Sequence, residues 1–324
     1  MRVTRRTILR LGGAAAVAPV WPAAADDWPS RPIRLVVGTA PGGSPDIIGR
    51  ILGEKLADRL GTAVVIENVT QGAGAVAYQA VSKSAPDGYT MGILTAGFPP
   101  QAALRRKSLA YDLVEGFSFV TMLCGYPMVY AVAPDSPIKS FKDLLERAKA
   151  APGRITYTIN ALGSIYHVLT KWIEIESGAL MTPVSYRGTA QALTDVVSGR
   201  IDLMVDAATS GFPRVQSGQL RLLAISSPGR YPLMPDAPTI AETLPGIEFM
   251  SWLGLAMAPA TPRPVVERIN KEIRDALELA DVQQRLSEGG NVASPSSPGE
   301  MRQKVESEIA RWTRVIEAGG IKVE

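Results

Sequence analysis

The segment Ile33–Leu60 reads IRLVVGTAPGGSPDIIGRILGEKLADRL and decides the fold. Its first five residues are apolar or β-branched apart from Arg34, which is typical of a buried strand. The stretch PGGSP at 41–45 ends that strand, and apolar residues at helical spacing predict a helix behind it. Those residues, expected on one face of the helix, are Ile47, Ile48, Ile51, Leu52, Leu56 and Leu60. A strand, a Gly-Pro loop and an amphipathic helix form the first unit of an α/β fold.

The same kind of unit recurs along the chain. Strands at 63–66 and 89–94, with a helix near 75–82 between them, complete a βαβαβ series that predicts a parallel sheet with helices on both faces. A second series follows Pro134, with helices at 141–149, 164–177 and 189–198 and strands at 154–158, 182–185, 201–205 and 221–225. An apolar strand at 249–258 then leads into helices near 262–279 and 298–318, and Ser297-Pro298-Gly299-Glu300 is a well-formed start for the last.

This order predicts two lobes connected by two crossings of the chain, near 122–133 and 248–258. Lobe 1 is expected to comprise 26–125 and 248–324, and lobe 2 to comprise 126–247. Two crossings between lobes make a hinge. The roughly 300 residues that follow the N-terminal leader also suit two cores better than one.

The N-terminus has the form of a twin-arginine export signal, Thr4-Arg5-Arg6-Thr7-Ile8-Leu9-Arg10. The apolar run at 11–20 is far shorter than the roughly 20 residues that a membrane-spanning helix needs. Ala23-Ala24-Ala25 then offers a small-residue cleavage site. We therefore expect residues 1–25 to be removed and the protein to reside in the periplasm.

Net charge excludes one class of partner. The leader contributes four arginines and no acid, so 30 basic and 31 acidic residues remain after it is removed, and the whole-chain pI of 8.9 comes largely from the leader. Nucleic-acid binding needs clustered Lys and Arg, and the longest basic run is only Arg105-Arg106-Lys107. We expect no nucleic-acid partner.

The residue counts leave little room for catalysis or cofactors. His167 is the only histidine and Cys124 the only cysteine, and no G-x-S-x-G sequence occurs. Metal sites built on His or Cys are therefore excluded, whereas calcium held by carboxylates alone stays open, without an EF-hand spacing. Residues 72–77 match the dinucleotide pattern G-x-G-x-x-A, but the acid expected roughly 20 residues later is missing. We expect no cofactor, a buried Cys124, and a structural His167 that orients its loop.

Three loops between a strand and a helix are the candidate ligand site. The N-terminus of a helix has unpaired N–H groups and a partial positive charge, so it can hold a carboxylate, and glycine lets the backbone approach the ligand. Any one such loop is as well explained as an ordinary tight turn; three together on two lobes favour binding. The candidate residues are Thr39, Ala40, Gly42, Gly43, Ser44 and Asp46, then Ala161, Gly163, Ser164 and His167, then Tyr186, Arg187, Gly188 and Thr189.

Several motifs together resemble the periplasmic solute receptors of tripartite tricarboxylate transporters, the Bug or TctC family. They are Trp28-Pro29-Ser30-Arg31-Pro32-Ile33, Pro41-Gly42-Gly43 with Asp46, Ala85-Pro86-Asp87-Gly88-Tyr89-Thr90, Gly163-Ser164 with His167, Tyr186-Arg187-Gly188, Gly199-Arg200-Ile201-Asp202-Leu203-Met204 with Asp206, and Pro235-Asp236-Ala237-Pro238-Thr239. The resemblance implies a type II periplasmic-binding fold whose two Rossmann-like lobes hold a carboxylate mainly through backbone N–H groups and water. It adds Thr95 and Asp206 to the candidate ligand-binding residues.

Departures from that pattern bear on the ligand. Thr39 stands where Phe is common, Ala161-Leu162 where Gly-Asn is common, and Tyr166 replaces a small residue. These changes indicate a pocket more apolar or aromatic than one for citrate.

The sequence thus predicts a monomeric, non-catalytic receptor that delivers a small organic carboxylate, a di- or tricarboxylate or an aromatic acid, to membrane permease subunits. Two alternatives stay open: an exported α/β enzyme, and a sensor subunit that presents the solute to a signalling partner.

Overall fold

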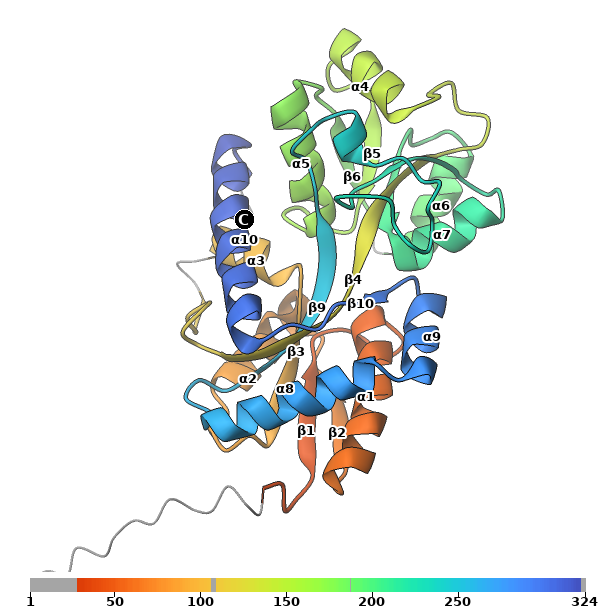
Figure 1. Cartoon of the computed structure of the whole chain (residues 1–324). Helices are drawn as coiled ribbons and strands as arrows, with labels where there is room; N and C mark the ends of the chain where they lie inside the picture. The colour runs from red at the N-terminus through yellow and green to blue at the C-terminus, as the bar shows by residue number, and fades with distance from the viewer. Residues whose placement is uncertain (1–27, 106–108, 187, 322–324) are drawn as a thin grey trace, which may run out of the picture.

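The computed structural model describes residues 28–105, 109–186 and 188–321. Within them the chain forms two α/β lobes joined by long strands (Figure 1). The first lobe, at the bottom of the figure, contains the N-terminal strands and the helices that follow the second crossing. The second lobe, at the top, contains the middle of the chain. In the part of the chain that the structure describes, no helix is long and apolar enough to cross a membrane.

The first lobe is built on the strands that the sequence predicts. Its elements are β1 (Ile33–Val37), α1 (Ser44–Leu60), β2 (Val64–Asn68), η2 (Gln71–Gly74), α2 (Ala75–Ser82), β3 (Thr90–Thr95), α3 (Phe98–Arg105), α8 (Arg263–Leu277), α9 (Ala280–Glu288), β10 (Val292–Ala293) and α10 (Pro298–Ala318). β1 pairs in parallel with both β2 and β3. The loop after β1 therefore lies at the carboxyl edge of a parallel sheet, where α/β folds bind ligands.

The parallel pairing predicted for these three strands is confirmed, and the sheet continues beyond them with antiparallel strands. β9 (Met250–Met257) pairs antiparallel with β3, and β4 (Ser118–Val132) pairs antiparallel with β9. The reason is topological: β4 leaves the lobe and β9 returns to it, so the two run in opposite directions.

β4 and β9 are the two predicted crossings. The first part of β4 pairs with β9, and its last residues, Met128–Val132, pair with β7 and β8 of the second lobe. One strand therefore belongs to both sheets. The boundaries predicted after 125 and before 248 lie within β4 and just before β9, and the division of the chain at those residues remains a proposal.

The second lobe repeats the strand–helix pattern. Its elements are α4 (Phe141–Ala150), β5 (Thr156–Ile159), α5 (Ile165–Ser177), β6 (Thr182–Ser185), α6 (Thr189–Val197), β7 (Met204–Ala207), α7 (Ala208–Gln216), β8 (Arg221–Ile225) and the short η3 (Ile240–Glu242). β5 and β6 are parallel, and an isolated parallel bridge joins Tyr157 to Leu203. The loops after β5, β6 and β7 therefore open toward the same edge.

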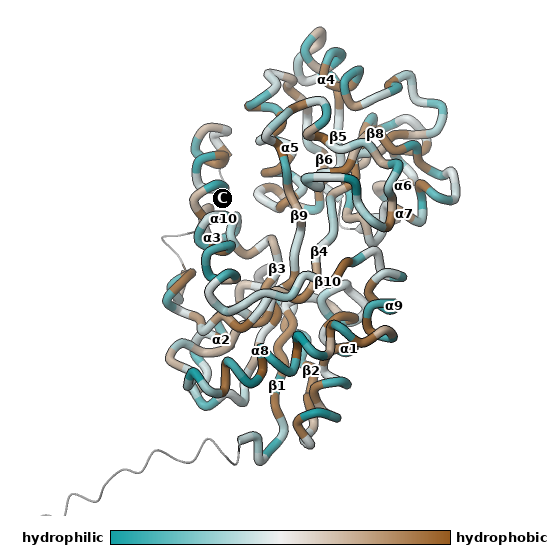
Figure 2. The backbone as a smooth tube through the Cα atoms, viewed as in Figure 1, coloured by the Kyte–Doolittle hydropathy of each residue, from teal (hydrophilic) through white to brown (hydrophobic). Residues whose placement is uncertain are grey.

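The core runs through both lobes, and the strands are the most apolar part of the chain (Figure 2). Trp252 of β9 and Trp312 of α10 are among the largest fully buried side chains. The indole N–H of Trp252 donates to the buried carboxylate of Glu308 at 2.8 Å. Trp312 packs edge-on against Trp172 of α5, with ring centroids 6.0 Å apart. α10 thus contacts the return strand and the second lobe together.

Three helices and some boundaries escaped prediction. α3, α7 and α9 were not predicted; α7 contains both Gly211 and Pro213, which read as helix breakers. Gly211 lies close against β4, since a β-carbon there would be 3.1 Å from Val129, a tight contact. Ile47 was expected on the buried face of α1 but is 48% exposed. It faces the cavity described below.

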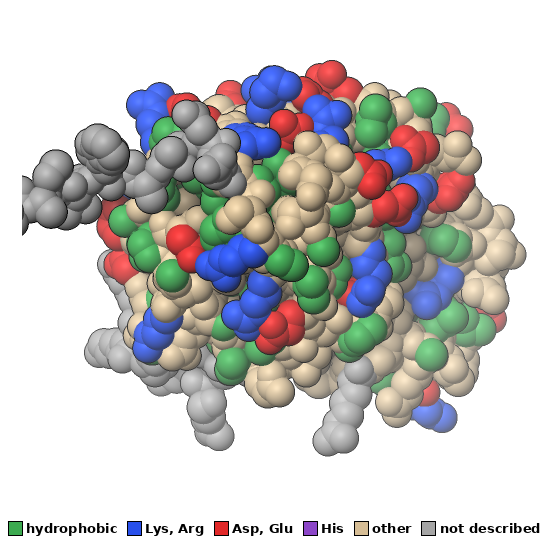
Figure 3. Space-filling view, turned by 90° about the horizontal axis from the view of Figure 1, so that it is seen from below, with side chains coloured by type: hydrophobic (Ala, Val, Ile, Leu, Met, Phe, Trp, Pro, Cys, Tyr) green, Lys and Arg blue, Asp and Glu red, His purple; other side chains and the backbone are tan. Residues whose placement is uncertain are grey.

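Charged side chains of both signs are mixed on the lower face of the molecule. Seen from below, the coloured part of the first lobe shows Lys and Arg side chains interspersed with Asp and Glu (Figure 3). The first lobe also has ion pairs between helices: Arg59 of α1 pairs with Glu272 and Asp275 of α8, both at 2.6 Å. No broad area of one sign is visible on that face.

Candidate functional site

A cavity of 540 Å³ lies between the two lobes. The first lobe contributes the start of α1 and the segment after α9, and the second lobe contributes α5, α6 and the β7–α7 junction. The lining residues are Gly42, Gly43, Ser44, Ile47, Ile48, Tyr126, Tyr166, Thr189, Asp206, Ala207, Thr209, Ser210, Arg285, Gly289 and Asn291. The first candidate loop, at Gly42–Ser44, and the third, at Thr189, thus both line this cleft.

A smaller cavity of 230 Å³ continues into the second lobe at the ends of β5, β6 and β7. It shares Tyr166, Thr189 and Asp206 with the interlobe cleft. Its other lining residues are Thr158, Ile159, Asn160, Tyr186, Gly188, Ala192, Met204 and Val205. The two cavities are therefore neighbours that share part of one wall.

The loop before α1 is held by Asp46. Gly42 has a φ of +82°, which favours glycine, and its N–H donates to Asp46 Oδ2 at 2.9 Å. Arg50 donates to both oxygens of the same carboxylate at 3.0 Å, and Asn68 donates to Oδ1 at 2.9 Å. These bonds, that from Arg50 first, lower the pKa of Asp46 to about 2 although burial opposes the shift. Asp46 is fully engaged and shapes the loop.

The loop before α5 has the same hydrogen-bond design. Gly163 has a φ of +76°, and its N–H donates to Nδ1 of His167, four residues later, at 3.0 Å. His167 therefore occupies the place that Asp46 has in the first loop. Burial, with a smaller effect of Lys171, lowers the pKa of His167 to about 4, so the imidazole is neutral at neutral pH and carries its proton on Nε2. This hydrogen bond is the kind expected of a structural His167, and its loop-orienting role remains a proposal.

The glycine N–H groups are consequently not free for a ligand. Besides the two bonds above, Gly43 N–H donates to Ala40 O at 3.1 Å and Ser164 N–H to Ala161 O at 3.2 Å. The donors that remain are the N–H groups of the first helical turns, which have no partner within their helix. Three hydroxyls beside these helix starts are further unpaired polar groups. Those of Thr39, Ser44 and Ser164 are buried and have no hydrogen-bond partner among the described residues.

The third loop contributes the start of α6. Gly188 is its N-cap, and both Gly188 and Thr189 line the cavities. The Tyr186 hydroxyl donates to Asp195 at 2.8 Å, which fixes the tyrosine against the helix that follows. Arg187 lies outside the described residues. Its proposed place among the ligand-binding residues stays a prediction.

Two tyrosines and one carboxylate form the centre of the cleft. Burial raises the pKa of the Tyr126 and Tyr166 hydroxyls, and the nearby charge of Asp206 adds to both shifts. Asp206 is itself buried, which raises its pKa, and it accepts bonds from Ala207 N–H at 2.9 Å and Arg214 at 2.8 Å. The hydroxyls of Tyr126 and Tyr166 are neutral and engaged with Ser251 and Ala207, and Arg214 balances the charge of Asp206.

The candidate residues divide into two groups. Gly42, Gly43, Ser44, Tyr186, Gly188, Thr189 and Asp206 line the cavities. Thr39, Ala40, Asp46, Thr95, Ala161, Gly163, Ser164 and His167 are not among the lining residues of either. The Thr95 hydroxyl, for example, is engaged with Tyr78 at 3.1 Å and with Gly97 N–H at 3.2 Å. For the second group we propose a supporting role behind the cavity wall.

Sequence reasoning missed the contribution of α9. Arg285, Gly289 and Asn291 line the cleft, although they lie more than 230 residues beyond the loop Gly42–Ser44 that they face. The sequence feature that could have indicated this contribution is Arg285 itself, which lies in the last turn of a polar helix. That helix is followed by Gly289-Gly290. Tyr126 was missed for another reason, because the run that contains it was interpreted only as a crossing strand.

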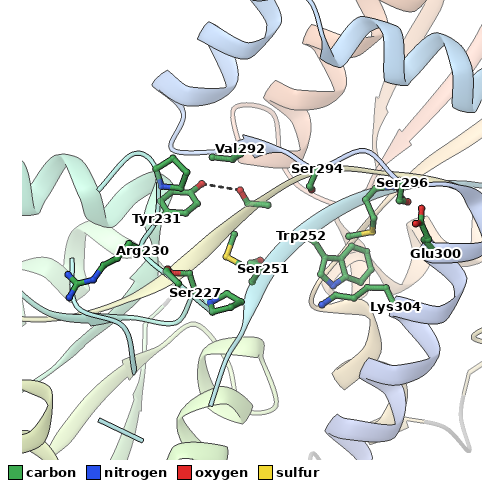
Figure 4. Close-up of a pocket in the computed structure, with 16 residues that line it drawn as sticks. Ser227, Arg230, Tyr231, Ser251, Trp252, Val292, Ser294, Ser296, Glu300 and Lys304 are labelled. Atoms are coloured by element: carbon green, nitrogen blue, oxygen red, sulfur yellow. Dashed lines mark hydrogen bonds between the residues drawn. The ribbon is translucent and has the colours of Figure 1, made fainter. Parts of the chain in front are cut away.

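A separate apolar cavity of 510 Å³ lies beside the crossing strands (Figure 4). Met122 and Trp252 lie on its β4 and β9 side, Tyr231 comes from the second lobe, and Lys304 comes from α10. The Tyr231 hydroxyl donates to Gly125 O at 3.2 Å. None of the three candidate loops reaches this cavity, so the interlobe cleft is the better candidate for the solute.

The remaining groups to consider are the cysteine and the side chains that could bind a metal ion. Cys124 is buried, and burial raises the pKa of its thiol to about 12, which confirms the prediction of an unreactive residue. Within the described residues, no group of three or more His, Cys, Asp or Glu side chains is placed to hold a metal ion.

Comparison with known proteins gives a consistent result. Residues 48–321 match the family described as "Tripartite tricarboxylate transporter family receptor". The chain is 31% identical over 305 residues to protein BugT of Bordetella pertussis, covering 94% of each. It is 33% identical over 293 residues to a UPF0065 protein from the tcbD-tcbE intergenic region of Pseudomonas sp. strain P51, covering 90% of this chain and 87% of that protein.

Solved structures share the fold. The R. palustris protein Rpa4515 with adipate superimposes with a TM-score of 0.80 at 33% identity, covering 91% of this chain and 99% of that one. MatC of Rhodopseudomonas palustris with bound malate superimposes with a TM-score of 0.76 at 28% identity, covering 89% of this chain and 100% of that one. The periplasmic binding protein BugD superimposes with a TM-score of 0.77 at 28% identity, covering 92% of this chain and 100% of that one. The predicted periplasmic-binding fold is confirmed.

Proposed function

This chain belongs to the receptors of the tripartite tricarboxylate transporter family, and we propose that it binds one organic acid in the interlobe cleft and delivers it to its permease subunits. It acts as a monomer, capturing and releasing the solute without making or breaking a bond. Similar proteins have been solved with adipate and with malate, both carboxylic acids, which supports an acid as the solute.

One observation carries this proposal: helix starts from both lobes line a single cavity, with Ser44 on one side and Thr189 on the other. Each helix start offers unpaired N–H groups and a partial positive charge to a carboxylate. The Ser44 hydroxyl, buried without a partner among the described residues, adds a donor at the same place. A solute that contacts both walls favours a closed arrangement of the lobes.

Matched serine variants test the location of the site. In calorimetric titrations with a panel of mono-, di- and tricarboxylates, we expect 1:1 binding of at least one acid by the wild type. Ser44→Ala should weaken it by about tenfold or more, because a hydrogen bond to a charged group contributes roughly 1.5–3 kcal/mol. Ser294→Ala, in the apolar cavity beside the crossing strands, should leave binding unchanged. The reverse pattern would place the solute in that other cavity, and a chemically converted acid recovered by mass spectrometry would favour an enzyme.

Export is the second part of the proposal. We propose that the leader at 1–25 is removed after Ala25, so that the mature protein begins at Asp26. Intact-mass measurement on periplasmic material should give the mass of 26–324. A mass that includes Met1 would contradict cleavage.

A further inference from the structure

The hydroxyl of Tyr231 connects a side chain of the second lobe to the backbone of the first. Tyr231 lies between β8 and η3, and its hydroxyl is 3.2 Å from the carbonyl oxygen of Gly125 (dashed line in Figure 4) and 3.1 Å from that of Gly290. Gly125 is on the part of β4 that pairs with β9, and Gly290 is in the turn between α9 and β10. One hydroxyl proton is thus shared by two carbonyl groups of the first lobe.

Tyr231 is held firmly in the second lobe. The residue is 3% exposed, and its ring packs against Phe212 of α7 with the ring centroids 5.8 Å apart. Its carbonyl oxygen accepts the N–H of Met234 at 2.8 Å. Burial raises the pKa of the hydroxyl, which therefore keeps its proton and acts as a donor at neutral pH. The second lobe sets the position of this hydroxyl, whereas both of its acceptors belong to the first lobe.

The turn that Tyr231 contacts is part of the wall of the interlobe cleft. Gly289 and Asn291, on either side of Gly290, line the cleft. Gly290 has a φ of +69°, and a β-carbon there would lie 3.0 Å from the Cα atom of Thr209 in α7. The turn is therefore held against the second lobe by two contacts, the close packing on Thr209 and the hydrogen bond from Tyr231.

The Tyr231 hydroxyl lies on the side of the crossing strands that faces away from the cleft. Gly125 and Val292 line the apolar cavity of Figure 4, whereas their sequence neighbours Tyr126 and Asn291 line the cleft. Successive residues of a strand face opposite sides of a sheet, so the two cavities lie on opposite sides of these strands. Tyr231 lines the apolar cavity. A rotation of the lobes that narrows one side widens the other, and it therefore changes the distances from the Tyr231 hydroxyl to both carbonyl oxygens.

We propose that Tyr231 is a positioning residue that holds the two lobes at the angle that forms the solute cleft, and that it supports solute binding without touching the solute. This inference rests on the proposed function. Without the hydroxyl the lobes occupy a wider range of angles, and the cleft is correctly formed in a smaller fraction of the molecules. The apparent affinity for the solute falls in proportion to that fraction. Lobes that are held in place before binding also lose less conformational freedom when the solute arrives.

Tyr231→Phe tests the proposal, because it keeps the buried ring and removes only the hydroxyl. Calorimetric titrations with malate, adipate, citrate and benzoate identify the acid that the wild type binds most tightly. We expect the variant to bind that acid about threefold to tenfold more weakly, as for the loss of one hydrogen bond between neutral groups.

The angle between the lobes is measured separately, in ligand-free protein. Spin labels are attached at Asp58→Cys on α1 and Lys142→Cys on α4, two exposed positions on different lobes. Cys124 is buried and is not expected to react with the label. Double electron–electron resonance then gives the distribution of distances between the labels. We expect Tyr231→Phe to broaden this distribution relative to the doubly labelled parent.

Two other buried tyrosines provide matched controls. The Tyr157 hydroxyl has no hydrogen-bond partner among the described residues, so Tyr157→Phe should change neither the affinity nor the distances. The Tyr130 hydroxyl bonds with Thr170 at 3.1 Å inside the second lobe. Tyr130→Phe should lower the urea midpoint of unfolding while it leaves the affinity and the interlobe distances as in the wild type. This control separates a general loss of stability from a change in lobe angle.

The two measurements can each overturn the proposal. If Tyr231→Phe has the same distance distribution as Tyr157→Phe, Tyr231 does not hold the lobes, even if the affinity falls. A broadened distribution with unchanged affinity would contradict its role in solute binding. If the wild type binds none of the four acids or any other of the carboxylate panel, the proposed function fails, whereas the ligand-free distances still decide whether Tyr231 fixes the lobe angle.

Discussion

His167 shows how a single buried side chain links loop geometry to pH. Its ring is 6% exposed, accepts the Gly163 N–H at 3.0 Å and has a pKa lowered to about 4, first by burial and then by Lys171. In the unfolded chain the same group titrates near 6.5. The unfolded state therefore binds more protons between these values, and this residue makes the fold less stable as the pH falls from about 6.5 to about 4.

We predict that His167→Asn removes this pH dependence while keeping an acceptor for Gly163. In the wild type, protonation linked to His167 should lower the free energy of unfolding by about 3 kcal/mol as the pH falls from 6.5 to 4. Urea unfolding at a series of pH values measures the difference between wild type and variant. The wild type alone does not isolate His167, because burial raises the pKa of Glu174 and Asp206. Protonation of those two carboxylates makes the fold more stable as the pH falls, which is opposite to the effect of His167. Parallel curves for the two proteins would contradict the prediction.

At the scale of the element, the two loops before α1 and α5 repeat one design with different chemistry. In each, a glycine with positive φ donates its N–H to the side chain four residues later, Asp46 in one and His167 in the other. The glycines build the loop, and the ligand is left the N–H groups of the first helical turn. A helix start that is braced in advance loses less entropy when the solute binds.

We predict that Asp46→Asn destabilises the protein by about 2 kcal/mol near neutral pH, because the native pKa near 2 lies below the unfolded value of 3.8. A carboxyl group whose pKa is lower in the folded state stabilises the fold at any pH above its pKa in the unfolded chain. This contribution is lost as the pH falls from about 4 to about 2. Urea unfolding of the variant beside Asp58→Asn, an exposed acid of the same helix, provides the measurement and the control. The control should change stability by less than about 0.5 kcal/mol. An Asp46→Asn protein as stable as the control would show that the loop does not depend on this charge.

At the scale of the whole molecule, three elements connect the lobes. β4 pairs in both sheets, β9 returns beside it, and α10 packs on Trp172 of the second lobe through Trp312. We propose that a hinge between the lobes lies where β4 leaves β9 for the second sheet, at Pro127 and Met128, and near Met250 on β9. Tyr126 directly precedes this point on β4 and lines the cleft. A solute that contacts Tyr126 therefore touches the chain next to the proposed hinge.

The sequence by itself determined the alternation of strands and helices, the two strands that cross between the lobes, and the position of the candidate loops between strand and helix. These follow from local patterns: β-branched runs, helical spacing of apolar residues, and Gly-Pro breaks. Ser297, for example, caps α10 through Glu300 with the predicted geometry. The tertiary structure alone decided which donors remain free, because the bonds of Gly42 to Asp46 and of Gly163 to His167 depend on side-chain placement. It also decided that Arg285 faces the cleft: α9 is distant in sequence and polar, and only its packing against α1 brings that charge to the site.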